Sequence, residues 1–256
     1  MHELRTFGSG PEEYAPQVLF FVHIPKCAGS SFRQVLKRWF GPDALTFDSH
    51  DGAALAKRVE SLPRTPRAIA GHFSFGIHQA ISCRPIHVSL VRDPVDRLVS
   101  LYKHARAVKD HFLHGAAASQ GLEAFYEHAL RKPRSRGQIL AIQCHFLSRA
   151  RTFEEARAVI DRDFAVLAPI ERFEDFVADC ARIVGRAPPA TVPIRNAGSS
   201  DPALDAARLA IAERVRAENP EDLQLYHHVR ERFESGSREW ALEAQDRGRA
   251  GLSRSM

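Results

Sequence analysis

Apolar runs alternate with stretches in which apolar residues recur every three or four positions. Continuous apolar runs at 18–24, 67–70, 86–91 and 164–170 predict buried strands, because a strand covered on both faces is apolar throughout. The helical spacing predicts amphipathic helices over 30–40, 52–62, 94–109, 173–184, 202–218 and 220–233. Strands that alternate with helices predict an α/β fold in three layers, with a central parallel sheet flanked by helices.

The length of 256 residues fits one domain. We expect a polar N-terminal segment at 1–17 and a folded domain at 18–234. The stretch 235–256 alternates charged residues with Gly and Ser, a composition typical of a flexible tail. No apolar run approaches the ~20 residues of a membrane span, so we expect no transmembrane segment. The start of the chain lacks an apolar signal region and the four cysteines form no CxxC pair, which favours reduced thiols and a cytoplasmic location.

The net charge of the chain excludes few classes of binding partner. Lys and Arg number 36 against 31 Asp and Glu, for a net charge of +5, which suits anionic ligands. The basic residues are scattered among acidic ones, as on solvated helix faces. A basic stripe interleaved with aromatic residues would indicate a nucleic-acid binder, and the sequence contains none. A nucleic-acid partner is therefore the weaker of the alternatives.

The segment 18–40, VLFFVHIPKCAGSSFRQVLKRWF, carries the clearest chemistry. An apolar strand runs into a polar turn that contains Lys26, Gly29, Ser30 and Ser31, and a helix pattern follows. The first N–H groups of a helix lack acceptors within it, and the helix dipole also favours an anion there. Lys26 adds a full positive charge. The segment predicts a phosphate or sulfate site, although an ordinary strand-to-helix turn has a similar composition.

A second segment, VSLVRDPVDRLVSLY at 88–102, places Arg92 at the end of a buried strand. Ligands bind at this end of the strands in open α/β sheets. Asp93 is predicted to cap the next helix, with Pro94 in its first position. Arg92 offers a bidentate guanidinium and Ser100 a hydroxyl, which suits a terminal phosphate. The alternative is that Arg92 pairs with a carboxylate such as Asp96.

Taken together, HIPKCAGSSF and RDPVDRLVSLY resemble the two phosphate-binding segments of sulfotransferases that use 3′-phosphoadenosine 5′-phosphosulfate (PAPS). The stretches FAVLAPIERFEDF at 164–176 and NPEDLQLY at 219–226 are similar to later parts of that family, so the resemblance spans about 18–234. The nearest group is the one that contains heparan sulfate 2-O-sulfotransferase and its bacterial relatives. The resemblance implies a P-loop-like fold, PAPS as sulfuryl donor, no metal, and an acceptor hydroxyl on a carbohydrate or glycolipid.

The resemblance also implies roles for single residues. Lys26 and the backbone of Cys27, Ala28, Gly29, Ser30 and Ser31 would bind the 5′-phosphosulfate, and Arg92 with Ser100 the 3′-phosphate. Arg195 and Asn196 belong to a late loop (192–200) that would fold over the nucleotide, or would form only a surface linker. The family loop usually reads PKTGGTS, so Cys27 and Ala28 are departures, and a thiol donates poorly where the family has a hydroxyl. A helix N-terminus can lower the pKa of a cysteine, but we expect no such effect at Cys27.

The motif Ala70-Gly71-His72-Phe73 follows the second predicted strand. Transfer of a sulfuryl group to an alcohol needs a base beside the acceptor oxygen, and histidine titrates near neutral pH. The resemblance implies that His72 is this base and that Lys26 stabilises the leaving group. An acidic residue, Asp48 or Asp51, is the alternative base.

The basic stretch 103–150 is a candidate lining for an acidic glycan; its residues are Lys103, His104, Arg106, Lys109, His111, Arg131, Lys132, Arg134 and Arg136. A kinase-like nucleotide enzyme is the main alternative function. It would need a Mg²⁺-binding Ser or Thr directly after the lysine, where Cys27 stands, and an acid at a strand end, for which only Asp93 is suitably placed. Because the histidines lack partners at ligand spacing, we expect no metal site.

Overall fold

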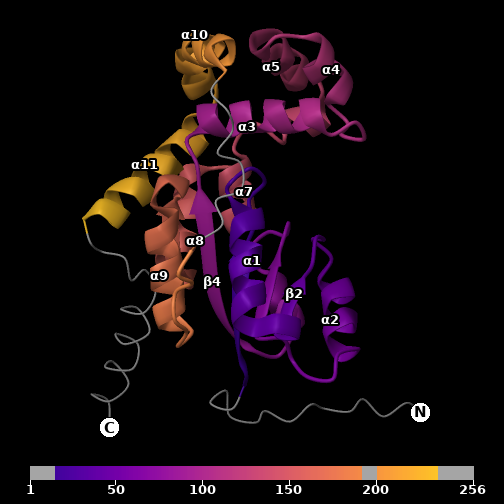
Figure 1. Ribbon diagram of the computed structural model, residues 1–256, viewed down its shortest axis with the longest axis vertical. Coiled ribbons are helices and arrows are strands. Elements are labelled where there is room, and N and C mark those ends of the chain that lie inside the picture. Colours follow the sequence, from indigo (N-terminus) through magenta and orange to yellow (C-terminus); the bar gives the residue numbers. More distant parts are fainter. Residues whose placement is uncertain (1–14, 192–200, 236–256) are drawn as a thin grey trace.

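The computed structural model describes residues 15–191 and 201–235, and five parallel strands form its sheet (Figure 1). Their order is β2-β3-β1-β4-β5. The strands are β1 (Gln17–Val22), β2 (Ala44–Thr46), β3 (Ala68–Gly71), β4 (Arg84–Val91) and β5 (Phe164–Pro169). The predicted α/β fold is confirmed, and each of the four predicted strands is present. The predicted N-terminal segment (1–17) and C-terminal tail (235–256) lie almost wholly outside the described residues.

Strand β2 was not predicted. It has three residues, pairs only with β3 at the sheet edge, and none of its residues is fully buried. Because this strand is short and exposed, the sequence has no apolar run at its position. Its conformation depends on pairing with β3 and not on the local sequence pattern.

The described helices include the six predicted ones, with small shifts at their ends, and five between 114 and 163 that were not predicted individually. They are α1 (Gly29–Phe40), α2 (Gly52–Glu60), α3 (Pro94–Ala107), α4 (His114–Ser119), α5 (Leu122–Arg131), α6 (Pro133–Arg136), α7 (Ile142–Ser148), α8 (Phe153–Asp163), α9 (Phe173–Ile183), α10 (Pro202–Glu218) and α11 (Pro220–Glu234). Short 3₁₀ turns η2 (Gly41–Asp43), η3 (Ile77–Ala80) and η4 (Ile170–Arg172) join some of them. Within the described ranges, no helix combines the length and apolarity that a membrane crossing requires.

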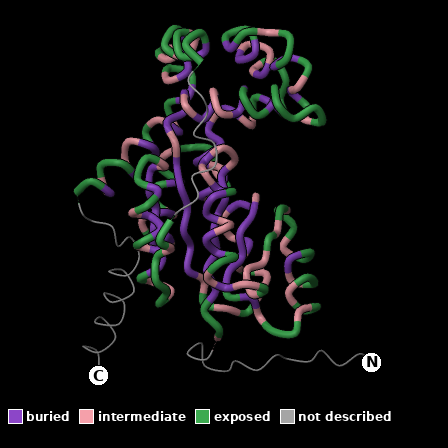
Figure 2. Tube along the Cα trace, in the orientation of Figure 1, coloured by how far each residue is buried: buried purple, intermediate pink, exposed green. Residues whose placement is uncertain are grey.

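Strand β1 is buried on both faces, which explains its unbroken apolar run. Strand β4 beside it is likewise buried along most of its length (Figure 2). Successive side chains of a strand point to opposite faces. Phe21 packs against Phe32 of α1 and Phe176 of α9, with ring centroids 4.8 and 6.4 Å away. Phe20 points the other way and packs against Phe73 and His87. The two faces of the sheet therefore have separate coverings, as expected for three layers.

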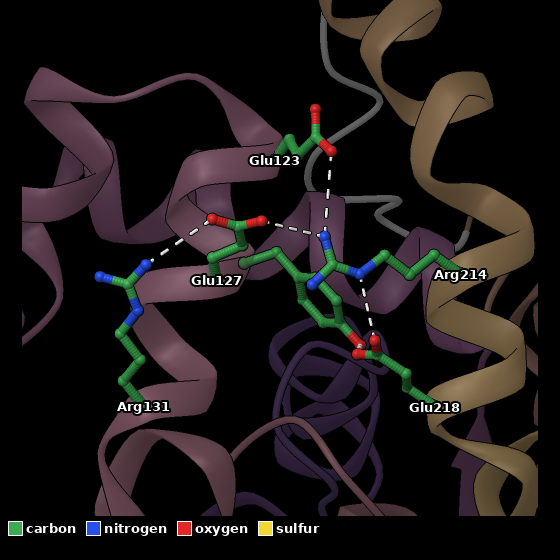
Figure 3. A network of polar contacts seen from close by, with 6 residues as sticks. Glu123, Glu127, Arg131, Arg214 and Glu218 are labelled. Atoms are coloured by element: carbon green, nitrogen blue, oxygen red, sulfur yellow. Dashed lines mark hydrogen bonds and ion pairs between the residues drawn. The ribbon is translucent and has the colours of Figure 1, made fainter.

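A second apolar cluster lies beyond the carboxyl ends of the strands, where α3, α4, α5 and α10 pack together (Figure 1). Arg214 of α10 pairs with Glu127 of α5 at 3.1 Å and with Glu218 of its own helix at 3.1 Å (Figure 3). The hydroxyl of Tyr126 donates to Glu218 at 2.9 Å. These contacts fix α10 against α5, so this helical layer closes over the edge of the sheet where the site lies.

The strand order places a topological switch at β1. From β1 the chain builds β2 and β3 on one side of it, then returns to build β4 and β5 on the other. The carboxyl ends of β1 and β4 meet at this switch, which is the usual ligand position in open α/β sheets. The loop after β1 and Arg92 after β4 both lie at this edge of the sheet.

His87 of β4 is a buried histidine whose titration should make stability depend on pH. Its Nδ1 lies 3.2 Å from the carbonyl oxygen of Asp163, and its Nε2 lies 2.9 Å from Nδ1 of His78. Burial lowers the pKa of His87 to about 3, against about 6.5 for an ordinary histidine. Between these values the unfolded chain binds a proton that the folded chain does not. Folding free energy is therefore lost as pH falls below about 6.5, at about 1.4 kcal/mol per pH unit for this group.

We expect this slope to shrink in His87→Phe. Urea unfolding at pH 7.5, 6.0 and 5.0 measures it. At pH 5.0 the wild type should have lost about 2 kcal/mol through His87 alone, and the variant should lose less over the same interval, whatever its stability at pH 7.5. Equal slopes in the two proteins would contradict the assignment.

Candidate functional site

The loop between β1 and α1 turns through two left-handed residues that are not glycine. Lys26 has φ 72° and Ala28 has φ 54°. Residues with a Cβ rarely adopt this conformation, which costs about 1 kcal/mol or more. It explains why the resembling loops have glycine where this chain has Ala28. The strained backbone starts α1 at Gly29, and the first N–H groups of a helix lack acceptors within the helix.

Gly29 is required by a close approach rather than by its φ. A methyl group at this position would lie 1.8 Å from the ring of His23, the residue that follows β1. The His23 ring stacks between Phe21 and His72, with ring centroids 5.6 and 4.1 Å away. Burial lowers the pKa of His23 to about 2, so its ring is neutral. His23 thus acts as a neutral spacer between the anion loop and the candidate base.

Both backbone groups of Arg92 bond to the side chain of Gln143 in α7, and its guanidinium bonds to the loop. Its N–H donates to Oε1 of Gln143 at 2.9 Å, and its carbonyl accepts from Nε2 of Gln143 at 2.8 Å. Its Nη1 donates to the carbonyl oxygen of Lys26 at 3.2 Å. The Nε of Arg92 is buried and has no partner in the described part of the chain. The guanidinium therefore retains donors for a ligand.

The structure thus brings two cations together at the start of α1. Burial lowers the pKa of Lys26, and the neighbouring charge of Arg92 lowers it further. Among residues 15–191 and 201–235, no carboxylate forms an ion pair with Lys26 or Arg92. Burial raises the pKa of Glu171 and the nearby charge of Arg92 opposes that shift, so this carboxylate lies near Arg92 without forming an ion pair. Two cations that lack an ion-pair partner beside a helix N-terminus favour an anion there. Asp96, the sequence-based alternative partner of Arg92, pairs instead with Arg208.

The other predicted ligands of this site are placed less tightly. Ser30 is exposed in the first turn of α1, whereas Ser31 is buried. Ser100 lies half-buried in α3, where its hydroxyl has no hydrogen bond within the described residues. Arg195 and Asn196 lie outside the described residues. The roles of all four as nucleotide ligands stay predictions.

Cys27 does not face solvent. Its side chain is fully buried, its Sγ lies 3.6 Å from Oε1 of Gln143, and its N–H donates to the carbonyl oxygen of Ile24 at 3.2 Å. Burial raises the pKa of the thiol to about 12, which disfavours the thiolate form. A contact of Cys27 with a nucleotide stays a prediction, and the structure commits both its thiol and its N–H to the protein.

His72 follows β3 and has the tautomer that a base requires. Its Nδ1 lies 2.9 Å from the carbonyl oxygen of His23. A carbonyl only accepts, so Nδ1 carries the proton and Nε2 of the neutral ring is free to accept another. Burial lowers the pKa of His72, which keeps the ring neutral near pH 7. His72 can therefore take a proton from an acceptor hydroxyl.

Asp48 and Asp51, the alternative bases, both form contacts that stabilise the local structure. Asp48 accepts from the N–H of His72 at 2.9 Å and pairs with Arg33 of α1. Asp51 caps α2 by accepting from the N–H of Ala54 at 3.1 Å. These contacts favour His72 as the base, with Asp48 as the group that positions its backbone.

The contacts of Asp93 and the positions of the histidines bear on two alternatives, a kinase-like reaction and a metal site. Asp93 caps α3, as predicted, by accepting from the N–H groups of Val95 and Asp96, and it pairs with Arg216 at 3.3 Å. That leaves this carboxylate poorly placed to serve the metal of a kinase. Within the described ranges no three His, Cys, Asp or Glu side chains cluster as a metal-binding group.

Sequence reasoning missed three residues that hold this site: His23, Gln143 and Asp222. Gln143 brackets Arg92, and the carboxylate of Asp222 accepts from the N–H groups of Gln143 and Cys144 at 3.0 and 3.1 Å. Asp222 lies in α11 and is fully buried. A sequence offers no signal for these contacts, because they join residues 51 and 79 positions apart. His23 lies two residues before Pro25 in the loop motif. This position was the one feature of the sequence that could have pointed to a role for His23 in the site.

Comparison with known proteins identifies the class. A model of the sulfotransferase family matches residues 15–183, and the chain belongs to this family. No curated protein matches the chain. Among solved structures, a sulfotransferase from Alicyclobacillus acidocaldarius is similar, with 18% identity, 83% of this chain and 96% of that chain covered, and a TM-score of 0.48. A mouse sulfotransferase complexed with PAP is also similar, with 14% identity, 78% and 66% covered, and a TM-score of 0.45.

Proposed function

We propose that the protein transfers a sulfuryl group from PAPS to an acceptor hydroxyl on a carbohydrate or glycolipid. One observation carries the donor assignment: Lys26 and Arg92 approach each other at the start of α1 without a carboxylate partner among the described residues. A donor with separate 5′-phosphosulfate and 3′-phosphate groups would satisfy both cations. The relationship to heparan sulfate 2-O-sulfotransferase and the cytoplasmic location remain predictions of the sequence.

The residues present fit such a donor. The open N–H groups of α1 and the ammonium of Lys26 would bind the 5′-phosphosulfate, and Arg92 with the hydroxyl of Ser100 the 3′-phosphate. PAPS, when bound, supplies the sulfuryl group and a phosphate leaving group. Lys26 neutralises the charge that grows on the departing phosphate oxygen, and this contribution is larger in the transition state than before it. His72 accepts the hydroxyl proton at Nε2 as the acceptor oxygen bonds to sulfur.

Binding of 3′,5′-adenosine bisphosphate tests the donor assignment without needing an acceptor. Calorimetric titration should give a Kd near or below about 1 μM in the absence of metal, and weak binding of ATP with Mg²⁺. Arg92→Ala should weaken bisphosphate binding by about 1.5–3 kcal/mol, the range for charged hydrogen bonds. Preference for ATP with Mg²⁺ would instead support a kinase-like enzyme. An unchanged affinity in Arg92→Ala would remove Arg92 from the site.

His72→Ala separates catalysis from donor binding. Because His72 would contact the acceptor oxygen rather than the phosphates, we expect bisphosphate binding to stay unchanged while turnover falls about 10²–10⁴-fold, the usual effect of a general base. His227→Gln on α11 is the control and should keep full turnover. If His72→Ala also loses bisphosphate binding, His72 is structural and the proton acceptor must be sought elsewhere.

A further inference from the structure

An ion pair connects the helix after the anion loop to the candidate base. Arg33 lies one turn after Gly29, the first residue of α1, and pairs with Asp48, which follows β2. The contact is bidentate: Nη1 of Arg33 donates to Oδ2 of Asp48 at 3.3 Å, and Nη2 donates to Oδ1. The same Oδ1 accepts from the N–H of His72 at 2.9 Å. One carboxylate oxygen therefore joins α1 to the residue that follows β3.

The sheet brings these groups together through a close approach of β2 and β3. The order β2-β3-β1 places the carboxyl ends of the three strands side by side. Just past β2, the N–H of Phe47 donates to the carbonyl oxygen of Ala70 at 3.1 Å. A Cβ on Gly71 would lie 1.6 Å from the carbonyl oxygen of Phe47, so only glycine fits there. This approach places Asp48 against the backbone of His72.

The two members of the pair act on the charge of His72 with opposite signs. Burial alone would raise the pKa of the Asp48 carboxyl, but hydrogen bonds from Arg33 and from the N–H of His72 lower it, so Asp48 is charged at neutral pH. Burial lowers the pKa of His72, whereas its hydrogen bond to the carbonyl of His23 and the charge of Asp48 raise it. The charge of Arg33 lowers this pKa again, as does that of His50 when protonated. The charge balance at His72 therefore depends on both members of the pair.

The pair is placed to position other groups more than to stabilise the fold. The side chains of Arg33 and Asp48 are 22% and 44% exposed, and ion pairs this exposed typically contribute about 0–1 kcal/mol. The Nε of Arg33 is buried and has no partner in the described part of the chain, so Asp48 is what holds the guanidinium in place. Replacing either side chain should therefore leave the fold intact.

We propose that Arg33 and Asp48 form one positioning unit for His72, which fixes the ring relative to α1 and sets the pH range in which Nε2 can accept a proton. The inference rests on the proposed function, because the use of His72 as a base belongs to it. Asp48 holds the backbone of His72 and favours its protonated form. Arg33 holds Asp48 and offsets its charge, so that the ring stays neutral over a wider range of pH.

Histidine NMR measures this charge balance without a donor or an acceptor. The titration midpoint of the His72 ring, assigned by the signal that is missing in His72→Ala, should rise by about 0.5 pH unit or more in Arg33→Gln, because the carboxylate is then unopposed. It should fall by a similar amount in Asp48→Asn, which keeps an acceptor oxygen but loses the charge. Arg33→Lys keeps the positive charge and should stay closer to the wild type than Arg33→Gln.

A second ion pair beside the same two strands provides the control. Nε of Arg64 and Oδ1 of Asp43 lie 2.7 Å apart, and these residues precede β3 and β2, at the opposite edge of the sheet from His72. Arg64→Gln and Asp43→Asn should leave the midpoint unchanged. The acid limb of kcat/KM, measured with a working acceptor, should move with the midpoint, to higher pH in Arg33→Gln and to lower pH in Asp48→Asn.

Midpoints that stay unchanged, or that move in the same direction in Arg33→Gln and Asp48→Asn, would overturn the positioning unit. A lower rate with no shift in either profile would also overturn it, because the pair would then be merely structural. Midpoints that move as expected, with an acid limb that does not follow, would support the unit and count against His72 as the base. The two proposals therefore fail through different measurements.

Discussion

Replacing Lys26 with alanine should nearly abolish sulfuryl transfer. The ammonium lies beside Arg92 at the start of α1, where burial already lowers its pKa and makes its charge poorly solvated. A preorganised charge in such a site stabilises a developing oxyanion far better than water does. Removal of one such donor typically costs about 10²–10³-fold in kcat, or about 3–4 kcal/mol. We expect Lys26→Ala to lose at least this much.

Lys37→Ala is the matched control, because Lys37 is an exposed lysine at the other end of the same helix. It should keep full turnover. Steady-state rates with a working acceptor and titration with the bisphosphate should be measured on both variants. The left-handed backbone at residue 26 accepts alanine no worse than lysine, so Lys26→Ala should fold. Full activity in Lys26→Ala would mean that the loop does not bind the reacting group.

Asp222→Ala should cause the largest loss of stability. The Asp222 carboxylate is fully buried and accepts from the N–H groups of Gln143 and Cys144 at the start of α7. Burial raises its pKa, whereas the nearby charge of Arg97 lowers it. Arg97 is itself buried, and its Nη2 donates to the carbonyl oxygens of Gln138 and Ile139. Removing the carboxylate takes away the negative charge near Arg97 and leaves two buried N–H groups without their acceptor, at about 1–3 kcal/mol each.

The same substitution should weaken donor binding, because Asp222 positions Gln143 and Gln143 holds both backbone groups of Arg92. Chemical unfolding measures the first effect and bisphosphate titration the second. Glu231→Ala is the control, an exposed carboxylate on the same helix, and should change stability by no more than about 0.5 kcal/mol. A loss below about 1 kcal/mol in Asp222→Ala would show that the buried carboxylate contributes little to stability.

The fold was predictable to the extent that it depends on local pattern. The apolar runs of β1, β4 and β5 are buried on both faces and stand out in the sequence for that reason. The cap at Asp93 and the start of α1 depend on neighbouring residues and were located within a residue. The short edge strand β2 depends on pairing with β3, which lies more than twenty residues away, and left no local signal.

The candidate site likewise combines residues that the local sequence predicts with features that depend on tertiary packing. Lys26 and Arg92 were found because each follows a strand, and parallel strands bring their carboxyl ends to one edge. The tautomer of His72 could not be found this way, since it depends on the carbonyl of His23. The burial of Cys27 likewise depends on how α7 packs against the sheet.

The sequence by itself determined the α/β class and the places of Lys26 and Arg92 after two strands of the sheet, because these follow from periodicity and from the order of strands and helices. Only the tertiary structure decided which groups are left unsatisfied. Asp96 pairs with Arg208 and Asp93 pairs with Arg216. Among the described residues, neither Lys26 nor Arg92 forms an ion pair with a carboxylate. Such pairings join residues more than a hundred positions apart, so only packing of α10 onto α3 can select them.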